Sequence, residues 1–255
     1  MPIILTNDDG LQSPTLHPLW RVLSSLGEVV IVVPSYEMSA SSHSVTLHKP
    51  LVVRELALEN GLKVFAVEGT PADCVLLSTR GIFSKVDLVV SGINIGPNLG
   101  WDIFYSGTVG AAREAAMYGV PAFSISLDCD GRGEHLDTAV QIASKIAGFL
   151  LQNPFPKNVF LNVNVPDLPR EEIRGVEITR LGKRLYPSPV REIFRENSKR
   201  VFWVGGETPL DDLNEGTDTW AVAHKRVSIT PLGLDLTSLA TLKELKSLRW
   251  EDVIE

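Results

Sequence analysis

The sequence has little cysteine: Cys74 and Cys129 are the only two cysteines among its 255 residues. Two cysteines are too few for a disulfide framework or for a cluster of cysteine zinc ligands. Also missing are an apolar run long enough to span a bilayer and the basic, then hydrophobic, start of a signal peptide. We therefore expect a cytoplasmic protein in a reduced environment, without a membrane partner.

An excess of positive charge is missing as well. The chain has 24 Lys and Arg residues against 31 Asp and Glu residues, which gives a formal net charge of −7. This balance argues against a general binding surface for a nucleic-acid polymer. It is compatible with a small phosphorylated substrate, because a bound cation supplies the local positive field that the overall charge lacks.

Strand and helix patterns alternate along the first two thirds of the chain. Helical spacing of apolar residues occurs at 16–26 and at 138–151, and Thr70 with Pro71 is typical of a helix start. The apolar runs typical of buried parallel strands lie at residues 2–6, 29–33, 86–90, 121–127 and 159–163. This alternation predicts an α/β fold, a three-layer Rossmann-like domain with a mostly parallel sheet over residues 1–170.

The pattern changes in the last third of the chain. Basic residues interspersed with glutamates predict a solvated β-hairpin, in which residues 201–204 pair with residues 190–194, or an arm that reaches a second subunit. The final helix carries an apolar stripe that must pack on its own core or on a partner, formed by Leu239, Leu242, Leu245 and Leu248. We expect residues 171–255 to form an oligomerisation arm and C-terminal segment that is packed with the first domain and is not independent.

The first strand ends in Asn7-Asp8-Asp9-Gly10. Ligands of open α/β sheets bind beyond the carboxyl ends of the strands, where this stretch lies. Two adjacent carboxylates repel each other unless a positive charge lies between them, and a hard divalent cation prefers oxygen ligands. The stretch therefore indicates a metal site, although the same residues also favour a simple turn.

The second strand ends in a loop rich in hydroxyl groups, residues 35–44, which contains Ser39 and one histidine, His43. Such loops are often polar linkers, but its place beside the acidic turn makes a ligand role plausible. From the loop alone, His43 is a candidate proton donor, a phosphate contact or a surface histidine.

A third group of polar residues follows the strand at 86–90, where Asn94 and Asn98 lie in a stretch rich in glycine and asparagine. Ser106-Gly107-Thr108 then begins a strong helix pattern. Free backbone N–H groups at a helix N-terminus bind anions, so this start is a candidate phosphate site. The alternative is an ordinary N-cap before a tightly packed helix. Neither a P-loop nor a dinucleotide-binding fingerprint is present.

Taken together, these motifs closely resemble the SurE (survival protein E) family of metal-dependent nucleotidases, which act on nucleoside monophosphates. The motifs are Asn7-Asp8-Asp9-Gly10, Ser39, Ser91-Gly92-Ile93-Asn94-x-Gly96-x-Asn98 and Tyr105-Ser106-Gly107-Thr108-Val109. The resemblance implies that the metal ligands, for Mg²⁺ or Mn²⁺, are Asp8, Asp9, Ser39 and Asn94. It places Asn98, Ser106, Gly107 and Thr108 around the phosphate.

The resemblance also implies a homo-oligomer, a dimer or a tetramer formed by exchange of C-terminal elements. Some relatives cut 3′ as well as 5′ phosphates, and some trim short polyphosphate. Two positions depart from the family pattern: Met38 stands where many relatives have Arg, and His43 stands where several have Asn.

The mechanism that we expect is in-line hydrolysis of a phosphomonoester by a metal-activated water. Asp8 or Asp9 accepts the proton of this water, the helix start at Ser106 stabilises the phosphate oxygens, and His43 is a candidate donor to the leaving alcohol. Three alternatives remain open: a phosphatase with an aspartyl-phosphate intermediate, a non-catalytic nucleotide-binding regulatory protein, and a metal-dependent glycosyltransferase. The first generally has one residue between its two aspartates, whereas here they are adjacent.

Overall fold

The structure, a computed structural model, describes residues 1–57, 62–187, 190–205, 208–248 and 250. Its centre is a nine-stranded sheet in the order β3-β4-β2-β1-β5-β6-β7-β13-β8. All pairs from β4 to β7 are parallel, whereas β3 is antiparallel to β4 and β13 is antiparallel to β7. The strands are β1 (Ile3–Thr6), β2 (Val29–Pro34), β3 (Val53–Ala57), β4 (Lys63–Val67), β5 (Leu88–Ile95), β6 (Ala122–Asp128), β7 (Val159–Pro166), β8 (Val176–Ile178) and β13 (Val227–Gly233).

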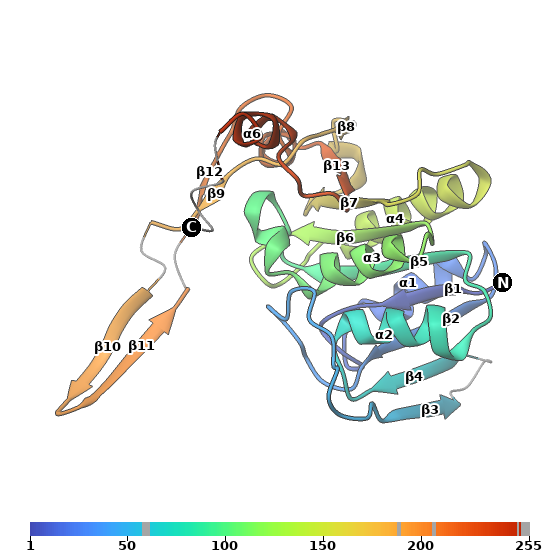
Figure 1. The fold of residues 1–255 in the computed structure, drawn as a ribbon. Helices are drawn as coiled ribbons and strands as arrows, with labels where there is room; N and C mark the ends of the chain where they lie inside the picture. The colour runs from blue at the N-terminus through green and yellow to red at the C-terminus, as the bar shows by residue number, and fades with distance from the viewer. Residues whose placement is uncertain (58–61, 188–189, 206–207, 249, 251–255) are drawn as a thin grey trace.

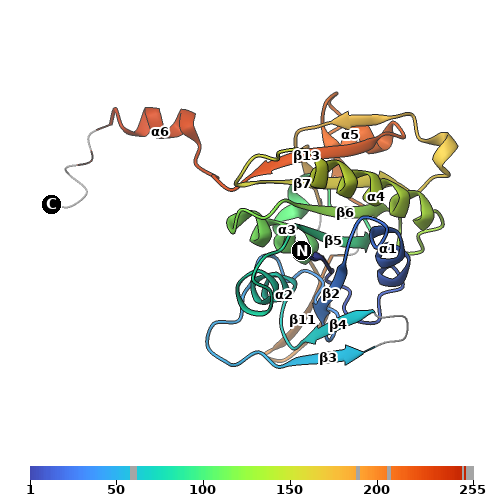
Figure 2. The same ribbon diagram turned by 90° about the vertical axis from the view of Figure 1, so that its right-hand side faces the viewer.

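Helices cover both faces of this sheet. On one face, α1 (Leu16–Leu23) and α4 (Leu136–Gln152) share a buried apolar cluster with the strands (Figures 1 and 2). On the other face, α2 (Pro71–Leu77) and α3 (Gly107–Met117) share a second cluster. The predicted three-layer α/β fold with a mostly parallel sheet is therefore confirmed.

The start of α2 follows the predicted capping pattern. The Thr70 side chain accepts a hydrogen bond from the Asp73 N–H, and the Asp73 carboxylate accepts one from the Thr70 N–H. The same carboxylate also accepts hydrogen bonds from the backbone and the hydroxyl of Thr46, at 2.8 and 2.7 Å. Asp73 therefore also fixes the chain that leaves the 35–44 loop.

The polar stretch predicted to follow the strand at residues 86–90 begins later than expected, because β5 continues through residues 91–95. The pairing of β5 with β6 shifts register between Ser91 and Asn94. Gly92, with a φ of +130°, occupies this irregularity, and a Cβ on it would collide with the carbonyl oxygen of Ile125. The absence of a side chain at Gly92 thus allows the strand to continue, and Asn94 lies near the end of a strand.

The last third of the chain contributes both to the sheet and to two projections. The projecting hairpin is β10 (Val190–Glu196) with β11 (Lys199–Val204), paired as predicted with Val190 opposite Val204 (Figure 1). The shorter elements of the chain are η2 (Ser78–Ile82), η3 (Gly100–Phe104), η4 (Arg170–Glu172), β9 (Arg184–Leu185), β12 (Leu210–Asp211) and α5 (Asp218–Ala223). The division at residue 170 stays a prediction, and two strands beyond it, β8 and β13, belong to the main sheet.

The last helix, α6 (Leu239–Leu245), extends away from the sheet and its helices (Figure 2). None of its residues is buried. Leu239 is 71% exposed and Leu245 is 41% exposed, so the predicted apolar stripe is not covered by the described residues of its own chain. None of the helices in the described part of the chain has the length and apolar character needed to cross a membrane.

Candidate active site

An open cavity of about 560 Å³ lies where the chain leaves β1, β2 and β5 and enters α3. Ligands of parallel sheets bind at this end of the strands. Most of the residues that the sequence predicts for the site line it. Its lining residues are Asp8, Asp9, Glu37, Ser39, Ala40, Asn94, Ile95, Asn98, Asp102, Tyr105, Ser106, Tyr186 and Gly205.

Asp8 is buried and is held by the start of α3. The Thr108 hydroxyl donates to Asp8 Oδ1 at 2.5 Å, and the Thr108 N–H donates to Asp8 Oδ2 at 3.1 Å. Burial raises the pKa of Asp8 above its ordinary value, while the two hydrogen bonds from Thr108 oppose that shift. Thr108 itself is fully buried and does not line the cavity.

Asp9 is half-buried and accepts one hydrogen bond, from Ser13 Oγ at 3.2 Å. Burial, followed by the charge of Asp8, raises the pKa of Asp9 from 3.8 to about 6. Glu37 and Asp102 bring the carboxylates of the cavity lining to four, and no Lys or Arg among the described residues lines it. The cavity therefore concentrates negative charge that these side chains leave uncompensated, as a cation site does.

The donor set fits a hard divalent cation. Ser39 Oγ donates to Glu37 Oε1 at 2.9 Å, and Asn94 Nδ2 donates to the Gly96 carbonyl at 2.8 Å, which leaves Asn94 Oδ1 as an acceptor. With the paired aspartates, this makes a set of oxygen ligands only, which Mg²⁺ and Mn²⁺ prefer. Within the described residues there is no group of three or more His, Cys, Asp or Glu that could hold a metal ion, so such a site depends on the neutral oxygens.

Asn98 is fixed by two asparagines of β7 that the sequence did not single out for the site. The Asn98 N–H donates to Asn164 Oδ1 at 2.8 Å, and the Asn98 carbonyl accepts from Asn162 Nδ2 and Asn164 Nδ2 at 2.8 and 3.0 Å. Its side chain donates to Ser126 Oγ at 2.7 Å. The sequence feature that could have identified them is a pair of asparagines at alternate positions of an otherwise apolar strand. Both are fully buried, and buried polar side chains need hydrogen-bond partners.

The predicted helix start begins as expected, with Ser106 as the N-cap of α3 and its hydroxyl accepting from the Val109 N–H at 3.1 Å. Gly107 lies against the acidic turn: a Cβ on it would lie 2.6 Å from Ser41 Oγ and 3.0 Å from Asp8 Cβ. Gly107, like Thr108, therefore lies behind the cavity and does not line it.

The structure does not bring His43 into the cavity lining. Its Nε2 lies 2.6 Å from Glu114 Oε2 on α3, and both side chains are largely buried. Of the roles that the sequence left open for His43, this geometry favours neither a phosphate contact nor a proton donor to the leaving group.

Residues of the last third complete the rim of the cavity. Tyr186 OH donates to Asp102 Oδ2 at 2.7 Å. Burial, followed by this hydrogen bond, raises the pKa of Tyr186 to about 12, so its hydroxyl stays protonated at neutral pH. The buried Asp218 carboxylate accepts hydrogen bonds from the Gly100 N–H and the Gly182 N–H, at 2.8 and 2.7 Å. It thereby connects the segment that leads to Asp102 with the segment that leads to Tyr186, and both of these residues line the cavity.

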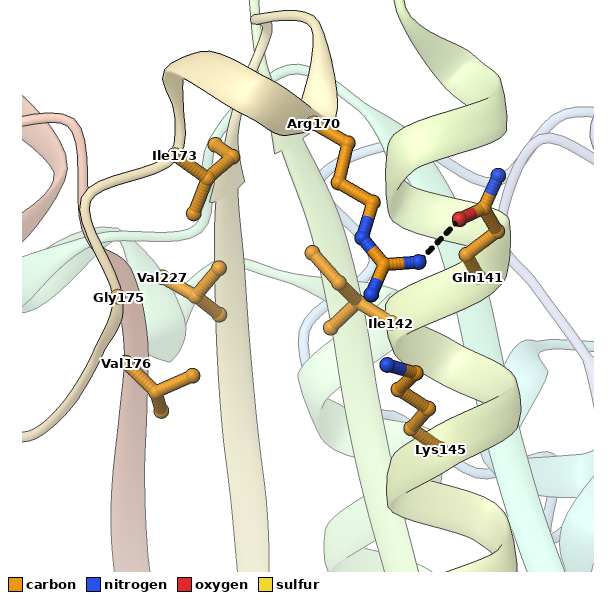
Figure 3. Close-up of a pocket in the computed structure, with 8 residues that line it drawn as sticks. All are labelled: Gln141, Ile142, Lys145, Arg170, Ile173, Gly175, Val176 and Val227. Atoms are coloured by element: carbon orange, nitrogen blue, oxygen red, sulfur yellow. Dashed lines mark hydrogen bonds between the residues drawn. The ribbon is translucent and has the colours of Figure 1, made fainter.

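A second cavity, of about 210 Å³, lies between α4 and strands β8 and β13 (Figure 3). Figure 3 shows an apolar wall that includes Ile142, Ile173 and Val227, with Arg170 donating to Gln141 Oε1 at 2.8 Å. In the described part of the chain, no carboxylate lines this cavity. It therefore lacks the ligands for a hard cation, and the cavity at Asp8 and Asp9 is the candidate active site.

Comparisons with known proteins agree with this choice. The family model described as "Survival protein SurE" matches residues 3–188. A 5′-nucleotidase SurE of Pelobacter propionicus is 47% identical over 95% of this chain and 97% of its own length. One of Carboxydothermus hydrogenoformans is 41% identical over 100% of this chain and 98% of its own length.

Among solved structures, the crystal structure of the SurE protein from Aquifex aeolicus aligns with a TM-score of 0.83 and 40% sequence identity. The alignment covers 96% of this chain and 98% of that chain. The matched segment of the family model contains all the motifs at the cavity. The chain belongs to the SurE family.

Proposed function

We propose that the protein is a metal-dependent 5′-nucleotidase that hydrolyses nucleoside monophosphates to nucleoside and phosphate. The observation that carries the proposal is the convergence, at one cavity, of Asp8, Asp9, Ser39 and Asn94 with the N-terminus of α3. The names of the relatives, 5′-nucleotidase SurE, support the same reaction and the same substrate class.

The divalent cation, Mg²⁺ or Mn²⁺, is held by Asp8, Asp9, Ser39 and Asn94 in this proposal. When bound, such an ion neutralises phosphate charge and lowers the pKa of water. The uncompensated carboxylates and the all-oxygen donor set support this assignment.

Among the protein's own groups, Asp9 is the one suited to accept the proton of the attacking water. Asp8 has both carboxylate oxygens engaged by Thr108, whereas Asp9 accepts one hydrogen bond and faces the cavity. The same engagement of Asp8 argues against Asp8 as a nucleophile that forms an aspartyl-phosphate.

The phosphate oxygens are bound in this proposal by Asn98 and Ser106, which line the cavity at the start of α3. Gly107 and Thr108 lie behind them, where the Thr108 N–H and hydroxyl hold Asp8. The Asn98 side chain is held in place by Ser126 and its backbone by β7, so no reorganisation is needed when charge develops in the transition state. The helix N-terminus supplies the positive end of the dipole toward the same place.

The proposal also includes a cytoplasmic homo-oligomer, a dimer or a tetramer, assembled through the C-terminal elements. The exposed stripe of α6 and the projecting β10–β11 hairpin support it, because both present apolar side chains to solvent. We infer no nucleic-acid polymer as a partner, in line with the net charge of −7.

Phosphate release from a panel of 5′- and 3′-nucleoside monophosphates and a short polyphosphate, with EDTA, Mg²⁺ or Mn²⁺, tests this proposal. We expect metal-dependent release from the 5′-monophosphates; the other substrates test the 3′-nucleotidase and exopolyphosphatase activities of the wider family. Binding of nucleotide without phosphate release would favour the regulatory alternative, and release of a sugar from a nucleotide sugar would favour the glycosyltransferase. A trapped phosphoenzyme would favour the aspartyl-phosphate route.

A further inference from the structure

The loop that carries Ser39, residues 39–44, lies directly on the start of α3. The Ser42 N–H donates to the Tyr105 carbonyl at 2.9 Å, and the Ser42 hydroxyl donates to the Phe104 carbonyl at 2.6 Å. These two bonds join the loop to the chain that precedes α3, on the side of the cavity.

Two glycines of α3 make room for this loop. A Cβ on Gly107 would lie 2.6 Å from Ser41 Oγ, and a Cβ on Gly110 would lie 2.5 Å from the Ser42 carbonyl oxygen. Both distances are shorter than real Cβ contacts, so the loop touches the helix backbone itself. The packing therefore fixes the height of the loop above the helix, and the two Ser42 bonds hold the loop where it meets the chain before α3. Holding the loop farther along the helix requires a second constraint.

The contact between His43 and Glu114 supplies that second constraint. His43 Nε2 lies 2.6 Å from Glu114 Oε2, and the two side chains are 18% and 5% exposed. For the Glu114 carboxylate, His43 is the one side-chain partner within the described part of the chain. A buried carboxylate requires such a partner, because an unpaired buried charge is strongly unfavourable.

We propose that His43 and Glu114 are positioning residues, which hold the 39–44 loop in register on α3 and so fix Ser39 relative to the paired aspartates. Neither side chain lines the cavity, so neither touches substrate or metal. This inference rests on the proposed function, in which Ser39 contributes an oxygen to the cation site. Groups that hydrogen-bond directly to a metal ligand generally affect metal affinity by about 10- to 100-fold. His43 and Glu114 act on Ser39 through the loop, so we expect an effect at the low end of this range.

The test compares H43A, E114A and E114Q with wild type and with a matched control, H48A. His48 is exposed in the same region of the chain and makes no side-chain contact of this kind in the described residues. Electron paramagnetic resonance measures the affinity for Mn²⁺, and hydrogen exchange measures the protection of the backbone at residues 38–45. Steady-state kinetics with a nucleoside monophosphate gives kcat and KM at increasing Mn²⁺ concentrations.

We expect H43A and E114A to bind Mn²⁺ about tenfold or more weakly, to exchange faster in the loop, and to recover activity as Mn²⁺ is raised. E114Q keeps an acceptor for the imidazole N–H, so it should stay close to wild type, as should H48A. Circular dichroism in EDTA shows whether each variant is folded without metal, because Mn²⁺ also stabilises a folded protein that binds it. In a variant that is folded in EDTA, recovery at high Mn²⁺ indicates a loss of metal affinity.

Unchanged Mn²⁺ affinity in folded H43A and E114A, with wild-type turnover, would overturn the proposal and leave the nucleotidase assignment intact. A wild-type protein that neither binds Mn²⁺ nor releases phosphate would instead remove the proposed function, and this inference with it.

Discussion

Asp9 is the side chain whose ionisation should report most clearly on the cavity. Burial and the neighbouring Asp8 raise the pKa of Asp9 from 3.8 to about 6, so in the metal-free protein the folded state binds this proton more tightly than the unfolded state does. The charged form of Asp9 thus destabilises the fold above about pH 6. That cost disappears as the pH falls from about 6 toward the unfolded value of 3.8.

Asp9→Asn should therefore stabilise the metal-free protein at pH 7, by about 1 to 2 kcal/mol once solvent screening of this half-buried group is allowed for. At pH 3 the difference between variant and wild type should nearly vanish, because Asp9 is then neutral in the folded state and mostly neutral in the unfolded state. Denaturant unfolding in EDTA at the two pH values measures this. A variant that is less stable than wild type at pH 7 would contradict the assigned environment of Asp9.

The two cysteines should differ in reactivity. Burial raises the pKa of the Cys74 thiol well above its ordinary value, and this side chain is fully buried, whereas Cys129 is half-buried. In the native protein at pH 8, a thiol reagent such as DTNB should modify Cys129 and spare Cys74, and denaturant should expose both. Cys129→Ser is the control, since it should abolish native labelling; persistent labelling of that variant would place Cys74 at the surface.

At the scale of elements, the start of α3 and the strand β7 hold the cavity from two sides. Gly107 approaches Asp8 and Ser41 so closely that any side chain must displace the acidic turn or the Ser39 loop. For Gly148, in the interior of α4, an added Cβ would have its nearest neighbour, Leu26 Cδ2, at 3.7 Å, which is ordinary contact. These two glycines form a matched pair for substitution.

Gly107→Ala should lower kcat/KM by at least about tenfold, because it shifts Asp8 or the Ser39 loop away from the geometry that the reaction requires. Gly148→Ala should leave kcat/KM unchanged and stabilise the helix by up to about 1 kcal/mol. Steady-state kinetics with thermal unfolding of both variants checks this. Equal kinetics for Gly107→Ala and wild type would show that the close approach has no role in the site.

Asn164→Ala removes the acceptor of the Asn98 N–H, which is left unpaired in a buried place. It also removes one of the two donors to the Asn98 carbonyl, which keeps its bond from Asn162 Nδ2. We expect a loss of stability of about 2 to 4 kcal/mol and a lower kcat/KM, since the loop that carries Asn98 loses its fixed position. Asn153→Ala is the control, because Asn153 is an exposed asparagine at the end of α4. A loss of the same size in both variants would argue against a specific role of β7.

The strands and helices were predictable because their patterns are local, whereas the supports of the site are not. The paired aspartates, Ser39 and Asn98 follow strands, so the sequence predicts that they converge. The bond from Gly100 to Asp218, by contrast, joins residues 118 positions apart, and no local pattern marks it. His43 shows the same limit: its sequence context leaves several roles open, and only packing against α3 reveals Glu114 as its partner.

At the scale of the whole molecule, two projections remain without a partner among the described residues. The α6 stripe is exposed at Leu239, Leu242 and Leu245, and the β10–β11 hairpin exposes Trp203 at 56%. Apolar side chains gathered on a projecting element generally mark a protein–protein contact. The expected homo-oligomer would cover them.

Leu242→Asp with Leu245→Asp should therefore shift the assembly toward a smaller species, since a buried interface tolerates unpaired charge poorly. Light scattering coupled to size-exclusion chromatography measures the mass of variant and wild type at equal concentration. Lys243→Asp, which changes charge on the same helix next to the stripe, is the control. An unchanged mass for the double variant would assign the assembly to another surface, and a monomeric wild type would exclude the homo-oligomer itself.

The most direct test of the account is a calorimetric titration of Mn²⁺ into wild type, Asp9→Asn and Asn94→Ala, with phosphate release from AMP measured on the same samples. We predict that wild type binds Mn²⁺ and turns over, and that both variants lose affinity and turnover together while remaining folded. Folded variants that bind Mn²⁺ as tightly as wild type, or a wild type whose turnover is indifferent to EDTA, would contradict the claim that these oxygens hold the cation on which hydrolysis depends.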